Sequence, residues 1–372
     1  MNVAAKSSDP ILRTTPELSS ACAAAAAEGV LALDTEFVWN STYRPRLGLV
    51  QLGCRGGCWA LDCFAGLNAD ALSNIVGDAS TVKILHDARQ DLALVRRYCG
   101  AEPRNVFDTQ LAAAFAGFPA GMGLQKLLFE AIDVGLAKTE TCTDWTRRPL
   151  SPAQVAYALD DVRYLPDLRD ELLSRAEGFG NRAYLEAEMS RLDGCALTLE
   201  SDPDSAWKRI KTRGIRLDPR GFAVLRAVAS LRERRAAELN LPRGWLGDDA
   251  SLVRMATDRR VGRISHRLNG GQAEIMRAKY EEAVKEALAL PDEECPENPR
   301  PRYISEVLSA SEEALAWLEA RADALHIAPS VIANRAELTA FVDNAENEDN
   351  PLASGWRFEV AGREIATRFA VD

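Results

Sequence analysis

Residues 30–37, Val-Leu-Ala-Leu-Asp-Thr-Glu-Phe, join a short apolar run to two acids. The run from Val30 to Leu33 has the length and composition of a buried strand. Asp34 and Glu36 are two residues apart, so on a strand both side chains point to the same face of the sheet. Ligands of α/β sheets collect at the carboxyl ends of strands, so these acids are candidates for a binding site. Two solvated acids at an exposed strand end explain the segment equally well.

Short strand patterns and helix patterns follow this segment. Two more β-type runs, at residues 47–52 and 59–64, are separated by glycines and predict an antiparallel meander. Beyond them the two patterns alternate, with helices expected at 69–76 and 89–98 and strands expected at 82–85 and 106–107. Such alternation predicts parallel pairing through right-handed crossovers. Residues 1–200 therefore predict one α/β domain on a mixed β-sheet of about five strands.

The chain is long enough for more than one hydrophobic core. Its 372 residues exceed the usual size of a single domain. After residue 200 the strand pattern disappears, and apolar residues recur at helical spacing over residues 217–290 and again over 302–345. Between these stretches lie residues 291–299, Pro-Asp-Glu-Glu-Cys-Pro-Glu-Asn-Pro, which predict a stiff acidic linker. We therefore expect two all-α helical modules, at residues 207–290 and 300–372.

Charge is distributed unevenly along the chain. The net charge of −10 by itself argues against a nucleic-acid partner. However, residues 207–279 hold 18 lysines and arginines against 7 acids, whereas residues 281–372 hold 8 against 20. Phosphate affinity follows the local field within a Debye length of about 8 to 10 Å. The middle module is thus the candidate surface for a nucleic-acid backbone. A solvated face is the alternative explanation of its basic run, Lys208, Arg209, Lys211 and Arg213.

The cysteines and the hydropathy pattern bear on the class of protein. No apolar run reaches the roughly 18 residues needed to cross a bilayer. The eight cysteines, at positions 22, 54, 58, 63, 99, 142, 195 and 295, show no regular close pairing. This distribution favours reduced thiols in a cytoplasmic protein over a disulfide framework. The spacing of Cys54, Cys58 and Cys63 fits no common zinc site, and the three histidines are distant in sequence.

A second acidic position lies in the helix expected at 89–98. Asp91 falls in its first turn, after the strand at 82–85. An acid in a first turn also stabilises the helix dipole without any catalytic role. Asp87 is equally well placed by this criterion, so the residues alone leave both acids open.

A third acidic position has a tyrosine one helical turn before it. Pro152 opens a helix in which Tyr157 and Asp161 stand at i and i+4. A tyrosine hydroxyl in that position can orient a water molecule beside a cation that the carboxylate binds. Asp160 points about 100° away around the helix, which favours Asp161. A half-buried core tyrosine with a nearby exposed acid is the alternative.

Carboxylates that gather at one point repel one another and resist ionisation unless divalent cations lie between them. If folding brings Asp34, Glu36, Asp91 and Asp161 together, the sequence predicts the centre of a phosphodiesterase that uses two metal ions.

These segments resemble the motifs of the DEDD superfamily of 3′ to 5′ exonucleases. Asp34-Thr-Glu36 is similar to the first motif, Asp91 to the second and Tyr157-Ala-Leu-Asp-Asp161 to the third. The Tyr-x-x-x-Asp spacing matches the tyrosine subclass (DEDDy). In the histidine subclass a histidine stands five residues before the last acid, and this chain has Ala156 there.

Longer segments resemble the ribonuclease D family. They are residues 34–39, 46–52, 106–115, 138–150 and 157–165, in the same order and at similar spacing. The helical modules resemble HRDC domains, and the first shares the pattern of Arg234, Ala237, Asn240, Pro242, Leu252, Met255 and Ala256. The resemblance covers nearly the whole chain. It implies a ribonuclease-H-like exonuclease domain followed by two HRDC-like helical bundles, and its register selects Asp91 over Asp87.

The resemblance also implies an activity. It implies a 3′ to 5′ exoribonuclease, a monomer in the cytoplasm, that trims the 3′ ends of tRNA precursors and other structured RNAs and releases nucleoside 5′-monophosphates. Asp34, Glu36 and Asp161 would hold one Mg²⁺ or Mn²⁺. Asp34 and, through water, Asp91 would hold a second, and Tyr157 would orient the attacking water. A 3′ to 5′ DNA exonuclease and a non-catalytic RNA-binding factor on the same scaffold are the alternatives.

Further residues are candidate substrate contacts. Phe37, with Trp39 after it, could stack on terminal bases, and Gln51 on the next expected strand could approach the terminal sugar. Three residues before the third motif could contact backbone phosphates, namely Lys138, Trp145 and Arg148. Core packing of Phe37, a hydrogen bond of Gln51 within the sheet and a solvated loop for the other three are the alternatives.

Overall fold

The structure of the chain is a computed structural model, which describes residues 10–136, 143–193, 202–262, 264, 267–299 and 302–371. These residues form two compact units. The first unit contains the described residues up to Phe37, those from Leu47 to 193 and those from Tyr303 onward. The second unit contains Val38–Arg46 and the described residues from 202 to Arg302.

A six-stranded sheet forms the centre of the first unit as far as the structure describes it, in the order β1-β4-β3-β2-β5-β6. Its strands are β1 (Ile11–Leu12), β2 (Val30–Val38), β3 (Arg46–Cys54), β4 (Gly57–Asp62), β5 (Val82–Leu85) and β6 (Val106–Asp108). β3 and β4 are antiparallel, whereas β2 pairs with β5, and β5 with β6, in parallel. The predicted change from a meander to parallel crossovers is therefore confirmed.

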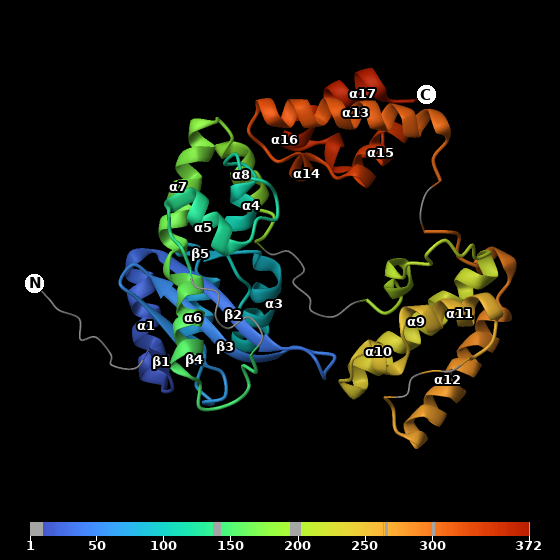
Figure 1. The fold of residues 1–372 in the computed structure, drawn as a ribbon, viewed down its shortest axis with the longest axis horizontal. Helices are drawn as coiled ribbons and strands as arrows, with labels where there is room; N and C mark the ends of the chain where they lie inside the picture. The colour runs from blue at the N-terminus through green and yellow to red at the C-terminus, as the bar shows by residue number, and fades with distance from the viewer. Residues whose placement is uncertain are drawn as a thin grey trace, which may run out of the picture. The chain divides into compact units, whose positions relative to one another are not determined.

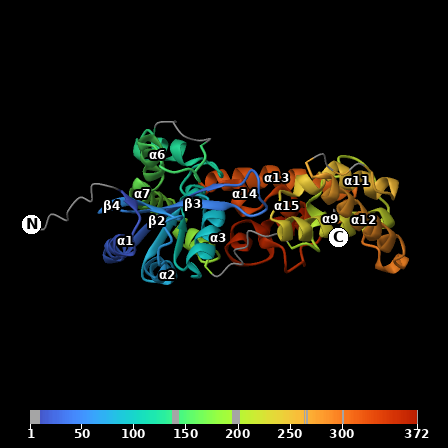
Figure 2. The ribbon, with the colours of Figure 1, turned by 90° about the horizontal axis from the view of Figure 1, so that it is seen from below.

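Helices cover both faces of this sheet. They are α1 (Thr15–Glu28), α2 (Asp70–Gly77), α3 (Ala88–Cys99), α4 (Thr109–Ala113), α5 (Leu124–Ile132), α6 (Pro152–Arg163), α7 (Leu165–Gly178) and α8 (Arg182–Met189). α1 and α2 lie on one side of the sheet and α6 lies on the other (Figure 2). α6 begins where the sequence predicts, because Ser151 and Gln154 form a capping box around Pro152.

The C-terminal helices pack on the sheet-containing part of the first unit. They are α13 (Ser305–Ala324), α14 (Pro329–Ile332), α15 (Arg335–Asp343), α16 (Gly355–Arg357) and α17 (Arg363–Phe369), with a π-helical turn at Phe358–Gly362. Glu188 of α8, 7% exposed, is the centre of this contact. It accepts hydrogen bonds from Trp356 Nε1 at 2.9 Å and from both terminal nitrogens of Arg357 at 2.5 and 3.0 Å. A buried ion pair thus joins two segments that are distant in sequence.

The second unit is a helical bundle of α9 (Pro219–Leu239), α10 (Arg243–Leu246), α11 (Asp249–Asp258) and α12 (Gly270–Leu288) (Figure 1). Residues 38–46, the tip of the hairpin between β2 and β3, belong to this unit. Tyr43 at the tip is 5% exposed and is part of the hydrophobic core of the bundle. Its hydroxyl donates to Glu233 Oε1 at 2.6 Å, and Arg44 donates to the Ala237 carbonyl at 2.9 Å.

The expected mixed-sheet α/β domain and the all-helical character of the later segments are confirmed. The sheet has one strand more than predicted, because β1 has only two residues and is too short to produce a periodic pattern. The boundaries proposed for three separate domains stay a prediction. In the described ranges, no helix is sufficiently long and apolar to span a membrane.

Candidate active site

Folding brings three of the predicted acids to one point. Asp34 and Glu36 lie on β2, and Asp161 lies on α6. A carboxylate oxygen from each lies within 4.8 Å of the others. More than 120 residues of sequence separate the two segments, so this proximity results from the packing of α6 on the sheet. Three convergent carboxylate oxygens are the ligand set that hard divalent cations prefer.

Asp91 and Asp87 have different surroundings. The carboxylate of Asp91 accepts a short hydrogen bond from the hydroxyl of Thr35, the residue between the two acids of β2. Asp87 is exposed, and its backbone N–H donates to Asp108 Oδ1 at 3.1 Å. Asp91 is therefore tied to the strand that carries Asp34 and Glu36. Asp87 precedes the first residue of α3 in a left-handed conformation, and its side chain makes no capping hydrogen bond. This geometry favours Asp91 as the fourth acid.

Burial and the charges of nearby acids raise the pKa values of all four acids. Burial, followed by the charges of Asp91, Asp161 and Glu36, raises the pKa of Asp34 well above its usual value. Burial and the same kind of repulsion raise the pKa of Glu36 to about 8. The pKa of Asp161 rises to about 7, mainly through burial, and that of Asp91 rises to about 6 for the same main reason. Such a cluster becomes fully ionised near neutral pH only with cations as counter-charges.

We therefore expect the cation-free protein to lose thermal stability as the pH rises from about 5 to about 8. In this range the folded state keeps protons that the unfolded state, with carboxyl pKa values near 4, has released, so the free energy of unfolding falls with pH. Calorimetry in EDTA at several pH values measures this slope. Mn²⁺ should remove it, and Asp34→Asn should flatten it. If the free energy of unfolding of Asp34→Asn falls with pH as steeply as that of the wild type, the acid cluster is not the cause of the pH dependence.

Tyr157 lies one turn before Asp161 and is partly buried. Burial, and then the charges of Asp161, Glu36 and Asp34, raise its pKa to about 12. Tyr157 therefore keeps its proton at neutral pH, and its hydroxyl is available as a hydrogen-bond donor. Its ring packs against the ring of Trp145, with centroids 6.1 Å apart. Trp145 is 4% exposed, so it supports the position of the tyrosine.

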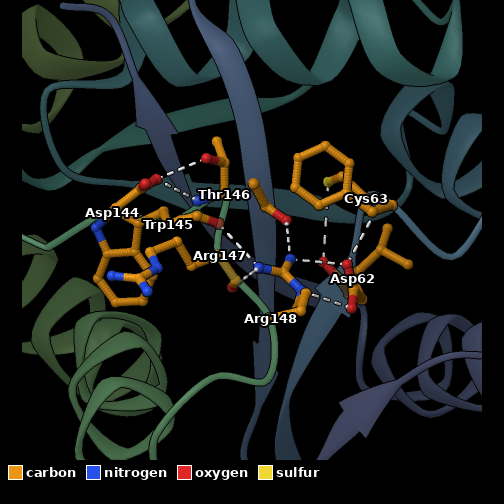
Figure 3. A network of polar contacts seen from close by, with 10 residues as sticks. Asp62, Cys63, Asp144, Trp145, Thr146, Arg147 and Arg148 are labelled. Carbon is orange, nitrogen blue, oxygen red and sulfur yellow. Dashed lines mark hydrogen bonds and ion pairs between the residues drawn. The ribbon is translucent and has the colours of Figure 1, made fainter.

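Arg148 fixes the loop that carries Trp145 (Figure 3). Its guanidinium binds both carboxylate oxygens of Asp62 at 2.8 and 2.7 Å and donates to the carbonyls of Gly48 and Trp145 at 3.0 and 2.9 Å. Burial alone would raise the pKa of Asp62, but the bonds from Arg148 and from the Phe64 backbone N–H, together with the charges of Arg148 and Arg13, lower it. The predicted contact of Arg148 with phosphate stays a prediction.

The structure leaves the other three predicted substrate contacts untested. Phe37 is partly buried at the end of β2. Gln51 is completely buried on β3. Lys138 lies outside the described residues. Their roles as substrate contacts stay predictions.

Two residues near the site were missed by the sequence reasoning, namely Thr35 and Asp62. By alternation Thr35 points away from its neighbouring acids, and nothing in the local pattern shows that a residue 56 positions later meets its hydroxyl. Asp62 lies at the end of β4, where a polar residue resembles any strand terminus. Its position at the end of a mostly apolar strand was the one feature of the sequence that could have drawn attention to Asp62.

Comparisons with known proteins agree with this geometry. Residues 11–177 match the profile of a family described as 3′-5′ exonuclease. The chain is 34% identical to ribonuclease D of Desulfotalea psychrophila over 360 residues, which covers 94% of this chain and 95% of that protein. It is 32% identical to ribonuclease D of Granulibacter bethesdensis, which covers 96% and 91% of the two chains.

A solved structure gives the same result. The fold matches that of Escherichia coli RNase D, described as an exoribonuclease involved in structured RNA processing, with a TM-score of 0.83 and 27% identity over 99% of this chain and 98% of that one. The expected ribonuclease-H-like exonuclease fold is thereby confirmed. From this match and the relatives over nearly its full length, the chain belongs to the ribonuclease D family of 3′ to 5′ exonucleases.

Proposed function

We propose that this 3′ to 5′ exoribonuclease trims the 3′ ends of tRNA precursors and other structured RNAs, as a monomeric cytoplasmic enzyme that uses two Mg²⁺ or Mn²⁺ ions. The observation that carries the proposal is the convergence of Asp34, Glu36 and Asp161 within 4.8 Å. The description of the Escherichia coli relative as a processor of structured RNA supports the choice of substrate.

The four acids have distinct parts in this proposal. Asp34, Glu36 and Asp161 hold one cation, and Asp34 with Asp91 holds the other. When bound, such ions polarise the phosphodiester and neutralise the charge on the departing 3′ oxygen. Thr35 fixes the carboxylate of Asp91 through its hydroxyl, so that this acid keeps its orientation before any ion binds.

Tyr157 orients the water molecule that attacks the terminal phosphodiester. Because its pKa is raised to about 12, its hydroxyl donates a hydrogen bond and does not remove a proton. Attack on phosphorus breaks the bond to the 3′ oxygen of the preceding nucleotide, which leaves the phosphate on the released nucleoside as a 5′-monophosphate. Trp145 and Arg148 hold Tyr157 in place through the loop described above.

A digestion of tRNA with an extended 3′ tail tests the proposal. We expect stepwise release of nucleoside 5′-monophosphates with Mg²⁺ or Mn²⁺ and none in EDTA, as measured by chromatography of the products. A DNA oligomer of matched sequence is the parallel substrate. Equal or faster degradation of DNA would favour a DNA exonuclease, and absence of products with either cation would favour a non-catalytic RNA-binding factor.

The second unit supplies the proposed RNA-binding surface. Lys208, Arg209 and Lys211 are exposed there, and none makes an ion pair within the described residues. We expect replacement of all three by glutamine to reduce the slope of log affinity against log salt by about 2, since each phosphate contact to a single strand contributes about 0.7. Binding titrations at several salt concentrations measure the slope. Arg277→Gln, which loses only a pair with Glu281, is the control.

A further inference from the structure

Gln51 of β3 is a polar side chain in an unusual position. It is completely buried, and neither its amide nitrogen nor its amide oxygen has a hydrogen-bond partner among the residues that the structure describes. Burying an amide without hydrogen bonds destabilises a fold, and an apolar side chain of the same size would avoid this cost. The position therefore suggests a partner that is present in the working enzyme.

Gln51 faces α6. Residues 51 and 53 lie on the same face of β3, because its pairing with β4 is regular from Leu49 to Cys54. A Cβ atom added at Gly53 would lie 3.1 Å from the Cβ of Val162, so α6 covers this face. The Gln51 amide thus lies between the sheet and the helix that carries Asp161.

Gln51 is the nearest residue before Gly53 on this face, about 7 Å along the strand, so its side chain lies near the part of α6 around Val162. Asp161 precedes Val162 on α6, and β2, the strand beside β3 in the sheet, carries Asp34.

The burial of Gln51 limits what it can touch. Both amide atoms are inaccessible, so the side chain is placed to act through its neighbours rather than on RNA directly. An amide has two donors and an acceptor, so it can bind a carboxylate and a water molecule at the same time. Carboxylates that hold a metal are themselves usually hydrogen-bonded, and loss of such a partner weakens metal binding about 10- to 100-fold.

We propose that Gln51 is a positioning residue of the cation site: with a cation bound, its amide hydrogen-bonds to the carboxylates of the acid cluster, directly or through a bridging water. The inference rests on the proposed function of that cluster. Gln51 holds the acids in the orientation that the cation requires, and the cation-free protein carries the cost of the unbonded amide.

Gln51→Met in the full chain tests the proposal, since methionine is of similar length and has no amide. We expect the dissociation constant for Mn²⁺, measured by calorimetry without RNA, to increase at least about tenfold. In EDTA the midpoint of thermal unfolding should rise by about 2 to 4 °C, because the unbonded amide is gone. Leu52→Met, a buried change on the opposite face of β3, should leave Mn²⁺ affinity unaltered.

The outcomes separate this inference from the proposed function. Unaltered Mn²⁺ affinity in Gln51→Met, with affinity lost in Asp34→Ala, overturns the inference alone. Unaltered affinity in Asp34→Ala as well overturns the cation site itself. If Gln51→Met does not fold, Gln51→Leu removes the amide with a branched side chain, and unaltered Mn²⁺ affinity in that variant is equally decisive against the inference.

Discussion

Asp34→Asn is expected to lower kcat/KM for RNA at least about a thousandfold, which corresponds to about 4 kcal/mol of transition-state stabilisation. Asp34 is the acid in the proposal that contacts both cations, and the amide that replaces it has no negative charge. The pKa of Asp34 is raised by burial and by the other acids, so the substitution also removes repulsion. The variant should therefore unfold at the same or a higher temperature than the wild type in EDTA.

The matched control is Asp87→Asn. Asp87 lies in the same signature segment as Asp91 but is exposed, and its side chain does not cap α3. We expect its kcat/KM to stay within about twofold to threefold of the wild-type value. Near-wild-type activity in Asp34→Asn would refute the proposed mechanism. A large loss in Asp87→Asn would show that the wrong acid of the segment was chosen.

Arg357→Met should be the most damaging single change for stability, with a loss of about 3 to 5 kcal/mol. It leaves the carboxylate of Glu188 buried without the Arg357 guanidinium. Among the described residues, only Trp356 and the exposed Arg191 still bond to it. Thermal and urea unfolding of the first unit measure the loss. Arg363→Met, which removes only a contact with the Phe358 ring, should change stability by less than about 1 kcal/mol.

The effect of Arg357→Met should depend on pH in a defined direction. Burial alone would raise the pKa of Glu188, but the bonds from Arg357 and Trp356 outweigh it and lower the pKa. A carboxyl with a lowered folded-state pKa adds stability above its unfolded pKa of about 4.3 and loses that stability as the pH falls through the folded value. The difference in the free energy of unfolding between the wild type and Arg357→Met should therefore become smaller below about pH 4. A difference independent of pH would mean that lost packing, not charge, is the cause.

The sequence predicted those parts of the site that depend on local periodicity. The strand that carries Asp34 and Glu36 follows from a short apolar run, and the helix that carries Tyr157 and Asp161 follows from the proline at 152 and the i, i+4 spacing. The choice between Asp87 and Asp91 required the resemblance to a family, because both satisfy the same first-turn rule. The structure adds a physical reason, since Asp91 alone reaches the hydroxyl of Thr35.

What the sequence could not predict depends on contacts between distant segments. The polar loop around Arg148 gave no sign that Asp62, 86 residues earlier, binds its guanidinium. Gln51 looked like an ordinary strand residue, and only the packing of α6 shows that its amide is enclosed without a partner. No local pattern encodes either contact.

The hairpin tip sets a limit on dissection of this protein into independent pieces. A fragment cut to the sequence boundaries of the helical bundle, residues 207–290, would lack Tyr43, which fills part of its interior. Glu233 would then lose the phenol that donates to it, while its carboxylate would keep the ion pair with Arg243 at 3.0 Å. The hydrophobic core of the bundle is therefore completed by a residue from the β2–β3 hairpin. Transfer of the bundle to another enzyme should require residues 38–46 as well.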